Sequence, residues 1–234
     1  MSLQMRTVFI ACIALTTIMG CASLGIITSA EHEFEMGLSF FNRGQYDEAV
    51  PYFVRATELD AHYADAFIYL GRFHLNKARW PQAIPPLRTA YRLSLVRTQS
   101  EAPNFLIDAL LGSAGSDFGK GNFQGAINYL MEGLELDADS NKLISELVTV
   151  LIAQGSELLS QGRIGDAISS FGEAIRISPA QGDAYLGLAR AFLKEGDLLK
   201  ALDAAEKAFR IDPSTPELDF FREGFGIGPG DLTK

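Results

Sequence analysis

The sequence predicts an all-α solenoid of five helix-turn-helix repeats with a short C-terminal capping helix. The first observation is a series of alanines at intervals of 34, 43, 41 and 34 residues: Ala49, Ala83, Ala126, Ala167 and Ala201. The second is that other small and bulky apolar residues keep a fixed place relative to each alanine. A unit of this length buries its apolar face only against neighbouring units, so the units are expected to stack into an array.

Residues 1–20 are predicted to be a lipoprotein signal peptide. The apolar run Val8–Met19 has the length of a signal-peptide core and is short for a membrane-spanning helix. It ends in Ile18-Met19-Gly20-Cys21, which resembles the bacterial lipobox, although Met19 is a mild departure. The resemblance implies cleavage before Cys21 and attachment of a diacylglycerol and fatty acid such as palmitate to that cysteine.

An uncleaved signal-anchor in the inner membrane is the alternative, because 24 uncharged residues run from Thr7 to Ala30. Its several Thr, Ser and Gly residues would make this segment a poor spanning helix, so the lipoprotein interpretation is favoured. Residues 21–29 would then form a tether of at most about 30 Å. Ala22 and Ser23 after the cysteine resemble the signal for release to the outer membrane, facing the periplasm.

The solenoid is predicted to occupy residues 30–213, with repeats at 30–63, 64–97, 107–140, 148–181 and 182–213. Each first helix has a small residue mid-way, which permits close approach of its partner: Gly37, Gly71, Ala114, Gly155 and Ala189. The turn follows at residues suited to ending a helix: Gly44, Ala78, Gly121, Gly162 and Gly196. A bulky anchor comes two residues later: Tyr46, Trp80, Phe123, Ile164 and Leu198.

The second helices carry the alanine series and two further positions on the same face. Four residues after each alanine lie Phe53, Leu87, Leu130, Phe171 and Ala205. Three residues further lie Ala56, Ala90, Gly133, Ala174 and Ala208. With Pro179 and Pro213 closing the last two units, this pattern resembles the tetratricopeptide repeat, which implies a right-handed α-solenoid.

Two insertions interrupt the period. Nine residues, Thr98–Leu106, precede the third unit, and seven, Asn141–Leu147, precede the fourth. The second insertion continues a helical pattern, so it predicts a first helix lengthened by about two turns. In the first insertion, Pro103 suits the first turn of another lengthened helix.

Residues 214–234 are predicted to form a capping helix and a flexible tail. Thr215 can cap a helix that Pro216 opens, with Leu218 and Phe221 on one face. Such a helix would cover the end of the solenoid.

The resemblance implies that the first helices line a concave groove that binds peptides or helices. Apolar residues at two positions seven apart form a strip along this predicted groove, and we refer to them as the apolar strip. Its members are Phe34, Ile68, Leu111, Ile152, Leu186, Phe41, Leu75, Phe118, Leu159 and Leu193. Such a strip marks an interaction site when exposed, and a helix-packing surface when buried.

Three positive residues lie near the predicted groove and could orient an acidic segment: Arg72, Arg190 and Lys194. The carboxylate clamp of some family members is rejected, because apolar residues occupy the places of its lysines.

No enzyme activity, cofactor or metal site is predicted. The three histidines are scattered, both cysteines lie before residue 22, and no nucleophile-histidine-acid set is visible. The acidic residues that begin the first helices are explained by the helix dipole. A net charge of −9 argues against nucleic-acid binding.

These observations predict a membrane-anchored scaffold for protein-protein interaction in a bacterial cell envelope. It would bind an extended segment or amphipathic helix of a partner during assembly of a pilus, secretion or outer-membrane machine. The alternative is a regulatory adaptor that recruits a periplasmic protease or peptidoglycan hydrolase to its substrate.

Overall fold

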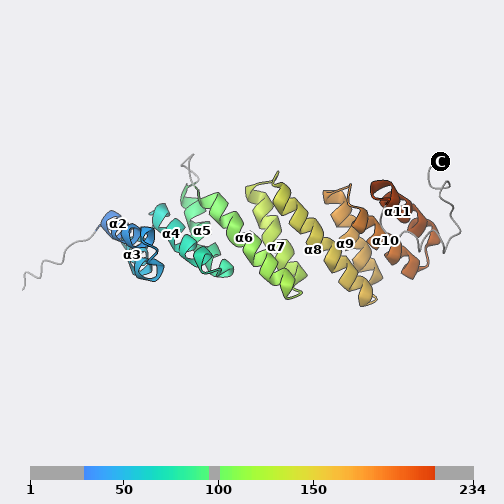
Figure 1. Ribbon diagram of the computed structural model, residues 1–234, viewed down its shortest axis with the longest axis horizontal. Coiled ribbons are helices and arrows are strands. Elements are labelled where there is room, and N and C mark those ends of the chain that lie inside the picture. The colour runs from blue at the N-terminus through green and yellow to red at the C-terminus, as the bar shows by residue number, and fades with distance from the viewer. Residues whose placement is uncertain (1–28, 95–100, 214–234) are drawn as a thin grey trace, which may run out of the picture. The chain divides into compact units, whose positions relative to one another are not determined.

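The computed structural model describes residues 29–94 and 101–213, and every element in these ranges is an α-helix (Figure 1). The prediction of an all-α array of five helix pairs is confirmed. The helices are α2 (Ala30–Asn42), α3 (Tyr46–Leu59), α4 (Ala64–Asn76), α5 (Trp80–Ser94), α6 (Ala102–Gly119), α7 (Phe123–Leu136), α8 (Asn141–Ser160), α9 (Ile164–Ile177), α10 (Gly182–Glu195) and α11 (Leu198–Ile211).

Several predictions concern residues outside these ranges. They are the signal peptide, lipidation of Cys21, most of the tether, and the capping helix and tail over residues 214–234.

The chain divides into two compact units, with the boundary between Ala66 and Phe67 inside α4. In the first unit, α2 packs against α3 through the ring of Phe53, which is fully buried. A Cβ atom added to Gly37 would lie 2.7 Å from that ring. The glycine in mid-helix is therefore what allows the two helices to approach.

In the second unit each helix from α5 to α11 packs against the next one along the chain, and α8 also contacts α10. The same large-on-small contact recurs. A Cβ atom added to Gly71 would lie 2.3 Å from Leu87, and one added to Gly155 would lie 2.8 Å from Phe171. The five alanines of the repeat series are all fully buried. The small residues predicted from the period therefore do lie where helices meet.

Both predicted helix extensions are present. Helix α6 has 18 residues with a proline in its first turn, and α8 has 20, whereas α2, α4 and α10 have 13 or 14. Helix α8 is also long and apolar enough to cross a membrane by length and composition alone. Its contacts with α7, α9 and α10 and its seven buried residues instead make it a core helix of the second unit.

The five tight turns share one backbone geometry. The residue at each predicted turn position has a positive φ, at Gly44, Ala78, Gly121, Gly162 and Gly196. At Gly162 the backbone N–H donates to Leu159 O (3.2 Å), and the next N–H, of Arg163, donates to Leu158 O (2.9 Å). The other four turns repeat this pair of bonds, which satisfies the last carbonyls of the helix.

Ala78 is the one turn residue with a Cβ atom in this left-handed conformation, at φ 52°. The Cβ atom costs about 1–2 kcal/mol there, partly offset by the greater freedom of glycine in the unfolded chain. We therefore expect Ala78→Gly to raise the free energy of unfolding by about 0.5–1 kcal/mol, measured by thermal or urea denaturation. The matched change Gly162→Ala should lower it by a similar amount. If both changes have the same sign, the turn conformation does not decide stability.

Candidate docking groove in the second unit

The structure places the ten residues of the apolar strip in two classes of burial. Half of them are buried: Phe34, Phe41, Ile68, Leu159 and Leu186. The other half are half-buried: Leu75, Leu111, Phe118, Ile152 and Leu193. None of the ten is fully exposed, so the strip is in part a helix-packing surface. Its role in docking stays a prediction.

In the first unit, both strip residues belong to an aromatic core. The ring of Phe34 lies 5.7 Å from that of Phe53 and 5.2 Å from that of Tyr63, and the ring of Phe41 lies 6.1 Å from that of Phe53. Edge-to-face contacts at such distances stabilise a core beyond the area that they bury. Replacing Phe34 or Phe41 would therefore test folding rather than docking.

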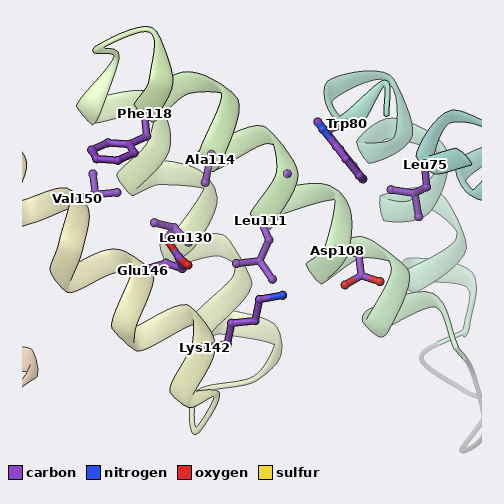
Figure 2. A pocket seen from close by; sticks show the side chains of 12 residues that line it. Leu75, Trp80, Asp108, Leu111, Ala114, Phe118, Leu130, Lys142, Glu146 and Val150 are labelled. Atoms are coloured by element: carbon purple, nitrogen blue, oxygen red, sulfur yellow. The ribbon is translucent and has the colours of Figure 1, made fainter. Parts of the chain in front are cut away.

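In the second unit, three of the half-buried strip residues line one hollow, which we call the central hollow (Figure 2). Its volume is about 460 Å³, within the range of ligand-binding clefts. Leu111 and Phe118 come from α6 and Leu75 from α4, while Val150 on α8 forms part of the facing wall. The hollow is thus built largely from first helices, as the resemblance implies for a groove.

Charged side chains border the central hollow. Lys142 and Glu146 extend from α8, and Asp108 extends from α6 (Figure 2). Lys142 and Glu146 both belong to the insertion that lengthens α8. None of the three side chains makes a hydrogen bond or ion pair within the described part of the chain. Lys142 and Glu146 were not predicted as site residues, because a surface charge on a helix carries no signal of what it borders. Asp108 was expected among the acidic residues that begin the first helices, and this was wrong, because the insertion moves the start of α6 to Ala102.

Trp80, the single tryptophan of the sequence, forms one side of the central hollow. Its indole ring lies against Gly112 of α6, where an added Cβ atom would lie 2.3 Å from the ring. The period predicted the bulky residue at position 80 but not its glycine partner. Gly112 does not fall at one of the repeated small positions. Its contact with Trp80 therefore becomes visible only in the three-dimensional structure.

A second hollow of about 500 Å³, which we call the C-terminal hollow, lies between α8 and α10. Its lining residues are Ser156, Leu159, Ser160, Phe171, Gly187, Arg190, Leu193 and Lys194. Lys194 Nζ donates to Leu159 O (3.1 Å), near the carboxyl end of α8, where a positive charge is favoured. Both charged residues that line this hollow, Arg190 and Lys194, are basic.

Arg72, the remaining predicted basic residue, borders neither hollow. Its guanidinium carbon lies 4.6 Å from the centre of the Tyr69 ring and 5.1 Å from that of the Phe105 ring. Two cation–π contacts thus hold this side chain against neighbouring aromatic residues.

The described residues contain no group of three His, Cys, Asp or Glu side chains that could hold a metal ion. One titratable side chain that burial perturbs is His74 on α4, whose Nδ1 is buried without a hydrogen-bond partner. Burial, and then the charge of Arg79, lowers the pKa of His74. Its ring lies 5.1 Å from that of Phe73, which identifies it as a packing residue.

A family model of the tetratricopeptide repeat matches residues 34–94 and 152–216, more than half of the chain. The chain belongs to the tetratricopeptide repeat family. Proteins of this family mediate protein-protein interactions, and their repeats are generally not catalytic. The family also explains the large-on-small contacts described above, since its small and aromatic positions are the ones that meet between helices.

Among curated tetratricopeptide repeat relatives, the chain is 34% identical over 77 residues to human anaphase-promoting complex subunit 7, covering 33% of this chain and 14% of that protein. It is 23% identical over 188 residues to a DnaJ homolog subfamily C member 7 homolog of Dictyostelium discoideum, covering 80% of this chain and 29% of that protein. The chain thus spans less than a third of these relatives. Among solved structures, a TPR repeats protein from Bacteroides fragilis has a TM-score of 0.63 at 15% identity, covering 85% of this chain and 98% of that one. This likeness shows the fold.

The lowered pKa of His74 predicts a pH dependence of stability. The unfolded chain, with an ordinary histidine pKa of about 6.5, binds the proton more readily than the folded one. The stability that neutral His74 contributes is therefore present above about pH 6.5 and is lost as the pH falls below it. We expect His74→Phe, which keeps an aromatic ring beside Phe73, to reduce the drop in melting temperature between pH 7.5 and pH 5.5. Parallel profiles for the variant and the wild type would contradict the prediction.

Proposed function

We propose that the protein is a non-enzymatic scaffold that holds a segment of a partner protein in the central hollow. The observation that carries this proposal is the composition of the hollow. An apolar floor of half-buried side chains is bordered by three charged side chains with no partner in the described chain. Apolar walls with a few polar groups are typical of binding sites.

The free energy of docking would come mainly from burying apolar side chains of the partner against the floor of the central hollow, formed by Leu75, Leu111 and Phe118. Burying one leucine- or phenylalanine-sized side chain of the partner contributes about 1.5–3 kcal/mol. Leu111 and Phe118 also pack against the core of the second unit, so the floor is held in place before the partner arrives. A preformed floor lowers the entropy cost of binding.

The proposed location is the bacterial cell envelope, with the chain anchored through lipid on Cys21. Stable anchoring needs two acyl chains, which a diacylglycerol supplies. The short tether would keep the first unit close to the bilayer, on the periplasmic side of the outer membrane. The partner would then be a subunit of a pilus, secretion or outer-membrane assembly machine.

Gly115 provides a clean test of docking. It lines the central hollow on α6, and a Cβ atom added there would meet no other atom within 4 Å. We expect Gly115→Tyr to fill the hollow and abolish partner binding while leaving the fold intact, since replacing a helical glycine does not lower helix propensity. Photocrosslinking from position 115 in the host envelope, followed by mass spectrometry, would capture and name the partner.

Gly172 on α9 is the matched control. It is also an exposed helical glycine with open space around its Cβ position, but it lines neither hollow. We expect Gly172→Tyr to bind the captured partner as the wild type does. Equal binding by both tyrosine variants would refute docking in the central hollow. A captured protease or peptidoglycan hydrolase, in place of an assembly subunit, would favour the adaptor alternative.

The anchor has a test of its own. Intact-mass measurement of protein purified from membranes should show a chain that begins at Cys21 and carries acyl groups. Cys21→Ser should leave residues 1–20 attached and carry no acyl groups. An unmodified cysteine in an uncleaved wild-type chain would exclude the lipoprotein proposal.

A further inference from the structure

Helix α8 separates two hollows of opposite charge. The charged side chains of the central hollow are two carboxylates, Asp108 and Glu146, and one ammonium group, that of Lys142. Those of the C-terminal hollow are Arg190 and Lys194, both positive. A segment that crosses α8 from one hollow to the other would pass from an acidic to a basic environment.

The carboxylates of the central hollow lie on two facing helices. The insertion Asn141–Leu147 supplies Glu146, and with Asp108 it gives carboxylates on both α8 and α6 (Figure 2). Exposed carboxylates that make no ion pair within the described residues attract a cationic side chain of a partner, because such a pair gains charge-assisted hydrogen bonds.

The C-terminal hollow has the opposite preference. Arg190 and Lys194 lie on the same face of α10, four residues apart, beside the apolar Leu193 and the ring of Phe171. The hydroxyl-bearing Ser156 and Ser160 complete the lining, and no carboxylate contributes to it. A partner segment with an acidic side chain next to an apolar one could place the first near the basic residues of α10 and the second against Leu193 and Phe171.

We infer that the docked partner is one segment with a basic residue for the central hollow and an acidic residue for the C-terminal hollow, each beside an apolar residue. This inference rests on the proposed docking function and adds to it the chemistry and orientation of the partner. Along α8, Glu146 and Ser156 are ten residues, or about 15 Å, apart. An extended segment covers about 3.3 Å per residue, so its two charges stand at least about five residues apart.

The test begins with peptides selected from a random display library on the wild-type protein and counter-selected on Gly115→Tyr. A selected peptide is compared with a version in which its basic and acidic residues are exchanged and its apolar residues kept. Binding is followed by calorimetry and by the fluorescence of Trp80, which lines the central hollow. We expect the exchanged peptide to bind about tenfold more weakly, a difference of about 1.4 kcal/mol, which shrinks as salt is added.

Charge reversal in the protein should reverse this preference. The double variant Glu146→Lys, Arg190→Glu should bind the exchanged peptide more tightly than the original one. Glu135→Lys on α7, an exposed acidic residue that lines neither hollow, is the control and should keep the wild-type order. Equal binding of the two peptides by the wild type would overturn this inference and leave the docking function standing. Failure of any peptide to prefer the wild type over Gly115→Tyr would overturn both.

Discussion

The contact between a large side chain and a residue without one is the constraint on which the structure depends. Phe171 shows it most clearly, because added Cβ atoms at both Gly155 of α8 and Gly187 of α10 would overlap its ring. One phenylalanine therefore sets how closely three helices approach. In the second unit such contacts lie within and between repeats, so neighbouring repeats share one core although a single repeat is too small to fold alone.

The same constraint explains why the groove face is only partly available for binding. Some strip residues of the second unit, such as Leu159 and Leu186, are buried in clusters with residues of the following helix. Others, such as Leu111, pack against the core of the second unit and still keep part of their surface uncovered. The apolar surface available for binding is therefore the part of the strip that the core does not cover. The insertion in α8 supplies two of the charged residues that border it, Lys142 and Glu146.

Much of this could be predicted from the sequence because the period fixes backbone positions. The turn at Ala78 and the extension of α8 follow from spacing alone, since helix geometry converts a residue count into a length. The charges of Lys142 and Glu146 could not be placed, because their neighbours lie on α6, more than 20 residues away in the chain. The burial of Phe41 could not be predicted either, because the sequence pattern of an apolar groove position is the same whether the side chain faces solvent or packs against another ring.

The second helix of the last pair differs from the other four in what it buries. The described core residues of α11 are all alanines, Ala201, Ala204, Ala205 and Ala208, whereas α3, α5, α7 and α9 each bury a phenylalanine or leucine. Because alanine side chains bury less apolar area, each contributes less free energy to the docking of α11 onto α10. In an array whose stability is a sum over neighbouring helices, each junction contributes according to the apolar area that it buries. The α10–α11 junction therefore relies on the close approach of two helices across alanines, where the earlier pairs rely on one large buried side chain.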